Sequence, residues 1–325
     1  MAGEGDPITH LGRWLMTLGA PGGRRGKLCV LIYHRVLPGP DPMCVGEVNQ
    51  ETFRWHVALL ARHCRVLPLS EALQGLAAGT LPPRAVAITF DDGYRDNAEV
   101  ALPILSEYRV PATFFVTTGF VGGGLMWNDR ITEFVRCTPQ DHLDLRALGL
   151  PAFELQTWEQ RRYAARELVL SLRRLADQQR SETVQAIIDG GSQMLPDNLM
   201  MEPAHVRQLA AAGMEIGAHT VNHPLLSRVD RRQAETEIAE SKDFLESLLH
   251  QPVALFAYPN GKPGTDYGAE HVAMVKRCGF QGAVSTRWGA ARRQDDPFQI
   301  PRLRPWQQSP GRFQLELARN TLRQG

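Results

Sequence analysis

A short apolar strand that runs into two aspartates constrains the fold of this chain more than any other stretch. Residues 85–89 are small, apolar or β-branched, so they predict a strand buried on both faces. Gly93 ends the strand and leaves Asp91 and Asp92 at its C-terminal end, where α/β folds carry their chemistry. Adjacent carboxylates repel each other, and a bound cation would let one act as a ligand while the other stays free as a base. From this stretch alone, the alternative is an Asp-Asp-Gly turn that caps the next helix.

Strand and helix patterns alternate on both sides of this stretch. Further strands are expected at residues 28–33, 65–68, 112–116, 214–218, 253–257, 282–285 and 299–303. Helices are expected at residues 51–63, from 70 onward, and at 95–108, 203–212, 231–250, 270–277 and 311–324. Pro103 is expected to kink its helix. The alternation predicts parallel strands with helical crossovers, and about seven or eight strands favour a closed or incomplete (β/α) barrel.

The strand rhythm stops between Gly119 and about Met201. Residues 127–136 have a helical pattern, and residues 158–190 are rich in Arg, Glu, Gln, Ala and Leu without an apolar strand. We therefore expect a helical insertion at about residues 121–200 of a barrel that spans residues 28–325, after an N-terminal extension at residues 1–27. The apolar content of the insertion is too small for us to expect an independent domain.

Composition narrows the classes of function. The chain has 325 residues, 43% of them hydrophobic, which is ample for the core of one large barrel. A net charge of +1 without a basic tract predicts no nucleic-acid partner. There is no apolar run of about 18 residues, so we expect no transmembrane segment and a cytoplasmic protein, with peripheral membrane contact left open. Five scattered cysteines predict free thiols.

A pair of histidines follows another predicted strand. His219 and His223 are four residues apart, and Pro224 disfavours a helix there, so both are expected on a loop at the strand end. A lone histidine pair is more often a helix cap or a polar group of the core. Two imidazoles and one carboxylate, however, form a three-ligand metal site with an open position, and Asp92 would complete that set. In a barrel, the C-terminal ends of all strands share one face.

The segment that contains Asp91 and Asp92 and the segment that contains His219 and His223 also resemble motifs of a known protein family. Thr89-Phe-Asp-Asp-Gly93 and His219-Thr-Val-Asn-His-Pro224 resemble the first two motifs of the polysaccharide deacetylases, also called the NodB homology domain or carbohydrate esterase family 4. Tyr-His-Arg-Val at residues 33–36, Pro-Ala-Thr-Phe-Phe at 111–115 and Phe-Ala-Tyr-Pro-Asn-Gly at 256–261 also agree. The resemblance covers about residues 28–120 and 200–305. It implies a distorted, TIM-like (β/α)7 barrel that removes N-acetyl groups from an amino sugar of a polysaccharide or its precursor.

The resemblance also implies roles for single residues. Asp92, His219 and His223 match the metal ligands, and Asp91 matches the base that deprotonates metal-bound water. The backbone N–H of Asn260 matches a group that binds the oxyanion. Zinc is the metal that this ligand set favours, although nickel, cobalt and iron suit similar ligands.

Two departures from the family pattern leave roles to be filled. Ala257 stands where the family commonly has an arginine that pairs with the base, and Arg302 at the end of the last strand is our candidate to replace it. The C-terminal Leu-x-His motif that supplies the general acid is not found, so His34 at the end of the first strand is our candidate. In the alternatives, Arg302 only covers the end of the barrel and His34 only hydrogen-bonds neighbouring loops.

Aromatic residues are the expected contacts of an N-acetylated carbohydrate. Tyr94 and Tyr258 adjoin the motifs, and Trp127 begins the insertion together with Asn128 and Asp129. Trp127 alternatively anchors its own helix by packing.

Two other functions stay open: hydrolysis of a non-carbohydrate amide on the same fold, and a catalytically weak barrel that binds glycan. The sequence does not indicate an oligomeric state.

Overall fold

A parallel barrel is the centre of the computed structural model, which describes residues 15–305, 307 and 309–322. Part of the expected N-terminal extension and the end of the last expected helix lie outside these residues. Within the described chain, the barrel has seven parallel strands. In spatial order they are β1 (Lys27–Tyr33), β5 (Ala85–Phe90), β6 (Thr113–Val116), β9 (Glu215–Ala218), β10 (Leu255–Ala257), β11 (Gly282–Trp288) and β13 (Ile300–Arg302).

Backbone hydrogen bonds join the last strand of the barrel to the first. The Leu303 N–H donates to Val30 O at 2.8 Å, and the Ile32 N–H donates to Leu303 O at 3.0 Å. All six residues of β5 are buried, as a strand covered on both faces requires. The distorted (β/α)7 barrel is thereby confirmed, and the C-terminal ends of β1, β5, β9, β10 and β13 lie at one end of it.

Short strands add to the barrel. Of the expected strand at residues 65–68, only Arg65–Val66 (β4) pairs, alongside the start of β5. Ala291–Arg292 (β12) runs antiparallel to β1, and Val36–Leu37 (β2) pairs with Val48–Asn49 (β3). The sequence did not predict β2, β3 and β12, because a strand of two residues is too short to show a hydrophobic period.

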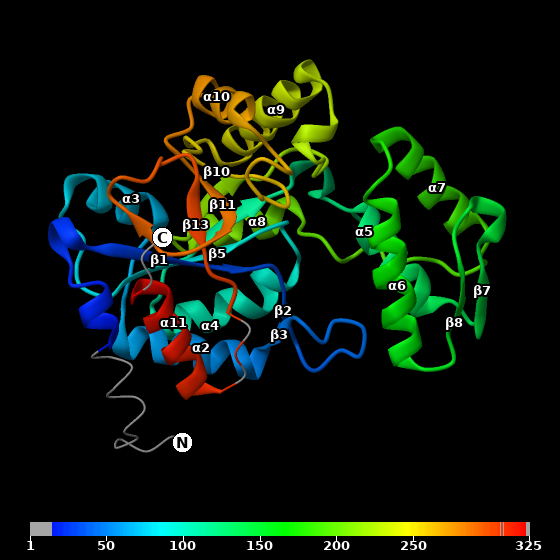
Figure 1. The fold of residues 1–325 in the computed structure, drawn as a ribbon, viewed down its shortest axis with the longest axis horizontal. Coiled ribbons are helices and arrows are strands. Elements are labelled where there is room, and N and C mark those ends of the chain that lie inside the picture. The colour runs from blue at the N-terminus through cyan, green and yellow to red at the C-terminus, as the bar shows by residue number, and fades with distance from the viewer. Residues whose placement is uncertain (1–14, 306, 308, 323–325) are drawn as a thin grey trace.

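Helices cover the outside of the barrel (Figure 1). They are α2 (Gln50–His63), α3 (Leu69–Ala78), α4 (Leu102–Tyr108), α8 (Pro203–Ala211), α9 (Arg231–Leu249), α10 (Ala269–Arg277) and α11 (Pro310–Leu322). Before α4, residues Asn97–Ala101 form a π-helix rather than the start of one long helix. Pro103 then falls in the first turn of α4, where its missing N–H breaks no helical hydrogen bond.

Aromatic stacking fixes the strands that carry the motifs. Tyr33 on β1 stacks on Phe90 on β5 with ring centroids 5.4 Å apart, and Phe90 stacks on Phe114 on β6 at 4.7 Å. Each such pair contributes about 0.5–1.5 kcal/mol beyond the area it buries. The strand ends that follow these rings are therefore held in register, which positions the loops that begin at His34 and Asp91.

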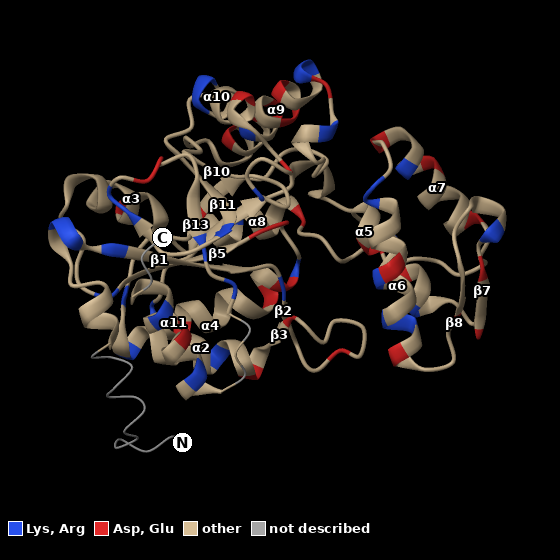
Figure 2. Ribbon diagram, viewed as in Figure 1, with Lys and Arg blue, Asp and Glu red and all other residues tan. Residues whose placement is uncertain are grey.

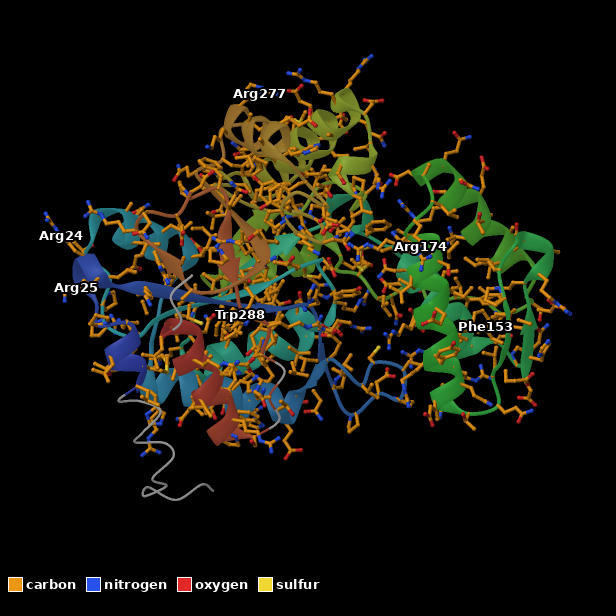
Figure 3. All side chains as sticks on the ribbon, viewed as in Figure 1. Arg24, Arg25, Phe153, Arg174, Arg277 and Trp288 are labelled. Atoms are coloured by element: carbon orange, nitrogen blue, oxygen red, sulfur yellow. The ribbon has the colours of Figure 1, made fainter. Side chains whose placement is uncertain are left out.

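The inserted segment has an apolar cluster of its own. It contains α5 (Trp127–Cys137), α6 (Trp158–Leu172) and α7 (Asp177–Asp189), together with an antiparallel pair, β7 (His142–Asp144) and β8 (Ala152–Glu154), that the sequence did not predict. Figure 1 shows these elements to one side of the barrel, and in Figure 3 side chains such as Phe153 fill the space between them. Met43, from the loop between β2 and β3, joins this cluster. The expected bounds of the insertion, and whether it folds alone, stay predictions.

Charges of both signs are interspersed on the outer helices, as the bands on α6, α9 and α10 show (Figure 2). All five cysteines are free, as expected. Among the described helices, none combines the length and apolar character needed to cross a membrane.

Candidate active site

Left-handed backbone conformations gather on the loops at one end of the barrel. Asp92 has φ of 78°, Thr220 of 66°, His223 of 56° and Asn260 of 57°. None of these residues is glycine, and each such conformation costs on the order of 1 kcal/mol or more. Strain of this kind persists only where the surroundings hold the backbone in place, and it concentrates at functional sites.

The three predicted metal ligands converge at this end. Asp92 Oδ1 lies 3.4 Å from Nε2 of His219 and 3.4 Å from Nε2 of His223. The three ligand atoms lie within 4.8 Å of one another, and Asp92 Oδ1 is buried without a hydrogen bond of normal geometry. Burial lowers the pKa of His223 to about 4, which leaves its imidazole neutral. A buried carboxylate oxygen facing two imidazole nitrogens suits a divalent cation.

Hydrogen bonds orient these ligands. His219 Nδ1 donates to Ala257 O at 2.7 Å, which leaves Nε2 free to bind a metal. The His223 N–H donates to Thr220 Oγ1 at 3.1 Å. The chain between the histidines is held by Glu237 of α9, which accepts from the backbone N–H groups of Val221 and Asn222 at 2.8 Å each.

Sequence analysis did not single out Glu237. Its signal is weak: it occupies the inward face of α9, together with Ala234 and Ser241, where a carboxylate without partners would be costly. The sequence shows the spacing of Glu237 on the helix. It does not show the partners of Glu237, because they lie on a loop elsewhere in the chain.

Arg302 reaches Asp91 from the other side of the site. Two guanidinium nitrogens of Arg302 donate to the two carboxylate oxygens of Asp91, each at 2.7 Å. Nε of Arg302 donates to Ser285 O at 3.0 Å, and a third contact reaches Thr89 Oγ1 at 3.1 Å. Burial alone would raise the pKa of Asp91, but the adjacent Arg302 guanidinium, together with His219 and His34, more than offsets it and holds that pKa below its ordinary value.

His34 and Asn260 border the same pocket, which has a volume of about 480 Å³. The backbone carbonyl of His34 accepts from Asn97 Nδ2 at 2.8 Å, while Nδ1 of its ring is buried without a hydrogen bond. The Asn260 carbonyl accepts from Thr286 Oγ1 at 2.7 Å, which fixes the loop. In the described part of the chain, no backbone hydrogen bond uses the Asn260 N–H, which is therefore available to a ligand.

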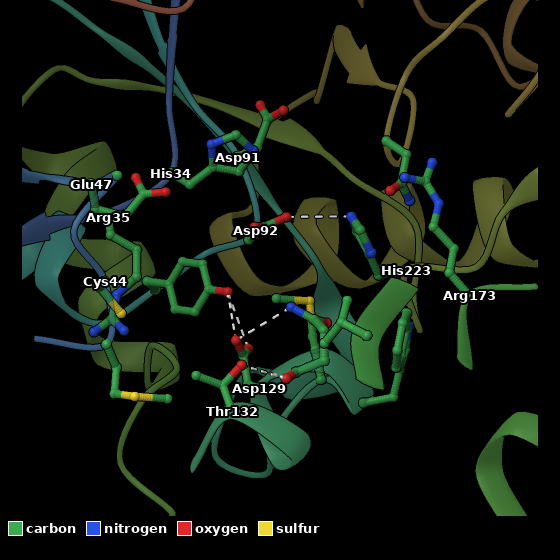
Figure 4. A pocket seen from close by; sticks show the side chains of 18 of the residues that line it. His34, Arg35, Cys44, Glu47, Asp91, Asp92, Asp129, Thr132, Arg173 and His223 are labelled. Carbon is green, nitrogen blue, oxygen red and sulfur yellow. Dashed lines mark hydrogen bonds and ion pairs between the residues drawn. The ribbon is translucent and has the colours of Figure 1, made fainter. Parts of the chain in front are cut away.

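The insertion forms the opposite wall of the pocket. Trp127, Asp129 and Thr132 of α5 line it. Figure 4 shows Asp129 and Thr132 across from His34, Asp91, Asp92 and His223. The Arg180 guanidinium lies 4.9 Å from the centre of the Trp127 ring, so that residue packs within the insertion as well as bordering the pocket.

The two tyrosines differ in position. Tyr94 lines the pocket, and its hydroxyl donates to Asp129. The structure does not bring Tyr258 to the pocket: its side chain is fully buried and stacks on Tyr267 with ring centroids 3.7 Å apart. A tyrosine next to a motif faces either the pocket or the core, and the sequence gives no register to decide which.

The comparison with known families agrees with this arrangement. The family model for polysaccharide deacetylases matches residues 78–283, which is more than half of the chain. The protein belongs to the polysaccharide deacetylase family, whose members are hydrolases that act on carbon–nitrogen bonds other than peptide bonds.

Individual relatives are distant. The Bacillus subtilis protein YxkH, whose name assigns it to the polysaccharide deacetylases, is 24% identical over 287 residues, which are 88% of this chain and 72% of that one. A poly-β-1,6-N-acetyl-D-glucosamine N-deacetylase of Staphylococcus aureus is 41% identical over 77 residues, 23% of this chain and 27% of that one.

Solved structures share the fold. The Streptococcus pyogenes deacetylase PplD, solved with acetate, has a TM-score of 0.58 at 22% identity and covers 86% of this chain and 92% of that one. IcaB from Ammonifex degensii has a TM-score of 0.56 at 20% identity and covers 91% of this chain and 97% of that one. Both likenesses extend well beyond the range that the family model matches.

Proposed function

We propose that this protein is a metal-dependent deacetylase that hydrolyses N-acetyl groups of an amino sugar in a polysaccharide or its precursor. The observation that carries the proposal is one pocket that Asp91, Asp92, His219 and His223 all line, with Arg302 paired to Asp91. The names of relatives support the substrate class, since one is a deacetylase of poly-β-1,6-N-acetyl-D-glucosamine.

Asp92, His219 and His223 would hold the cation, for which we propose zinc, with nickel, cobalt and iron as alternatives. When bound, the cation supplies Lewis-acid chemistry, because it polarises an acyl carbonyl and acidifies water. The neutral imidazole of His223 and the free Nε2 of His219 are the forms that such binding requires.

Asp91 is the proposed base. Its bidentate pair with Arg302 keeps the carboxylate ionised and fixes its orientation, so it can take a proton from the attacking water. The oxygen of that water bonds to the acyl carbon. The carbonyl oxygen becomes an oxyanion, and we propose that the Asn260 N–H donates a hydrogen bond to it. The carbon–nitrogen bond then breaks, and protonated His34 gives its proton to the leaving nitrogen. The products are acetic acid, which ionises to acetate, and a free amine, and the proton that Asp91 took is lost again while His34 regains one for the next turnover.

The remaining residues are proposed as substrate contacts. Trp127 and Tyr94 border the pocket and offer surfaces to a sugar ring, whereas the burial of Tyr258 suits a role beneath the Asn260 loop. We also propose that residues 28–325 act as one catalytic unit, with the segment at about 121–200 inserted as a wall of the pocket.

The experiment that tests the proposal measures acetate release from a panel of N-acetylated sugars, including nucleotide-linked and lipid-linked precursors and β-1,6-linked oligosaccharides. Zinc-loaded enzyme is compared with chelated enzyme and with Asp91→Asn. Release that needs both the metal and Asp91 supports the proposal. No release from protein that holds one metal per chain would favour a non-carbohydrate amide or a binding role. Protein that holds no metal would refute the assignment of the three ligands.

A further inference from the structure

Asp129, from the insertion, is a buried carboxylate in the wall of the pocket. It lies in the first turn of α5, and only 8% of its surface is exposed. The Tyr94 hydroxyl contacts both of its carboxylate oxygens at 3.1 Å, and Asn128 Nδ2 donates to Oδ1 at 3.3 Å. Both partners are neutral. Buried carboxylates are ordinarily paired with a cation, and none of the ion pairs within the described residues involves Asp129.

The other charged groups in this wall already have partners. Arg35 pairs with Asp96 at 2.8 Å, and Arg173 pairs with Asp266 at 3.0 Å. On the same wall as Asp129, Glu133 pairs with Arg136 at 2.9 Å. Arg136 also pairs with Asp41 at 2.9 Å, so the guanidinium groups beside this part of the pocket are engaged by other carboxylates, and within the described residues none of them forms an ion pair with Asp129.

The carboxyl of Asp129 keeps capacity for a further donor. A carboxylate has about four lone-pair sites, and two neutral donors do not fill them. The residue lines the pocket that also holds Asp91 and the three predicted metal ligands, so its carboxyl lies beside the space where a substrate would bind (Figure 4). Val169 and Leu170 of α6 line the same wall and offer apolar surface beside it. A polar acceptor next to apolar surface suits a sugar, whose ring presents hydroxyl groups at its edge and C–H groups on its faces.

We propose that Asp129 is a substrate-binding residue that accepts a hydrogen bond from a hydroxyl group of the sugar in the pocket. This inference rests on the proposed function and extends it, because it gives the insertion a part in selecting the substrate. The hydrogen bond does not depend on ionisation, since both protonation states of a carboxyl keep an acceptor oxygen. The alternative is that the Tyr94–Asp129 contact only docks the insertion on the barrel.

The test combines protein variants with substrate analogues. Acetate release is measured with a β-1,6-linked N-acetylglucosamine pentasaccharide and with its 3-deoxy and 4-deoxy analogues, each lacking one kind of ring hydroxyl. The proteins are the metal-loaded wild type, Asp129→Ala, Asp129→Asn and Tyr94→Phe. Asp129→Asn keeps the shape and an acceptor oxygen, and Tyr94→Phe removes the docking hydrogen bond but leaves the carboxyl. Thermal unfolding of each variant shows whether the fold is intact.

We expect Asp129→Ala to lower kcat/KM for the parent pentasaccharide about 10- to 100-fold, and one deoxy analogue to lower it by a similar factor with wild type. The loss from the variant and the loss from the analogue should not multiply. For Asp129→Ala, kcat/KM should be nearly the same with that analogue as with the parent pentasaccharide. Asp129→Asn should recover part of the activity, and Tyr94→Phe should keep the preference for the parent over the analogue.

Losses that multiply for both analogues, or no loss with Asp129→Ala, would overturn the inference. So would a Tyr94→Phe variant that behaves like Asp129→Ala on every substrate, because the two residues would then share a docking role. Failure of the proposed function looks different, since wild type itself would then release no acetate from the parent pentasaccharide.

Discussion

The guanidinium of Arg302 and the carboxylate of Asp91 form two hydrogen bonds of 2.7 Å each, between residues on β13 and at the end of β5. The Arg302 side chain is fully buried, and Asp91 is 3% exposed. Ala257, where the family commonly has this arginine, lies on β10. The guanidinium that accompanies Asp91, our proposed base, thus reaches it from a different strand of the barrel, which is feasible because all strand ends meet on one face.

Replacing Arg302 should change how activity depends on pH. In wild type, Arg302 holds the pKa of Asp91 below its ordinary value, so the base stays ionised into acidic solution. In Arg302→Met, burial remains without the guanidinium and raises the pKa, so the acidic limb of the kcat/KM profile should move to higher pH. An acidic limb at an unchanged pH would contradict the pairing role. Arg287→Gln, an exposed change on β11, is the control.

Removal of a ligand should abolish metal binding and the stability that comes with it. His223→Ala deletes one imidazole of the set, and His142→Ala deletes an exposed imidazole on β7 as a matched control. We expect one metal per chain in wild type and in the control, and close to none in His223→Ala. Zinc at about 100 times its Kd should stabilise wild type by about 2.7 kcal/mol, measured as a rise in the free energy of unfolding. Equal stabilisation of His223→Ala would exclude this site.

The role of His34 predicts a dependence on the leaving group. If protonated His34 gives a proton to the departing nitrogen, His34→Gln should lower kcat on an N-acetylated sugar by about 10²- to 10⁴-fold. A nitroaniline is a much better leaving group than a sugar amine and depends less on a proton donor, so any acetate release from an acetylated nitroaniline should fall less. Full turnover of the sugar by His34→Gln would rule out the assignment.

The sequence predicted most of the site because the motif residues end strongly apolar strands. Asp91, Asp92 and His219 follow strands that pattern alone identifies, and a barrel brings their ends together without further information. Arg302 was proposed because the resemblance calls for an arginine where Ala257 stands, and it is a charged residue at the end of the last expected strand. Its distance to Asp91 was not predictable from pattern, because that distance depends on how the sheet closes.

Other features of the site depend on contacts between segments far apart in the chain. Tyr258 faces the core rather than the pocket, and a stack with Tyr267 decides that orientation. Glu237 contacts the loop between the two histidines and Asp129 contacts Tyr94, and neither contact is visible as a local motif. The pair β7 and β8 and the two-residue strands β2, β3 and β12 were missed because short elements have no measurable period.

A buried histidine far from the pocket should make stability depend on pH. His56 of α2 is fully buried and stacks on Phe313 with ring centroids 4.2 Å apart; it accepts from the Tyr33 hydroxyl and donates to Gln307 O. Burial lowers its pKa from 6.5 to about 4. As pH falls below 6.5, the unfolded chain binds a proton that the folded protein does not, so stability is lost until the loss levels off near pH 4. The loss of stability should amount to roughly 3 kcal/mol over that window.

Urea unfolding at several pH values, with His56→Gln as the non-titrating comparison, measures this loss. The variant will be less stable at pH 7, but it should lose less stability than wild type between pH 6.5 and pH 4, and equal losses in the two proteins would show that His56 is not the titrating group.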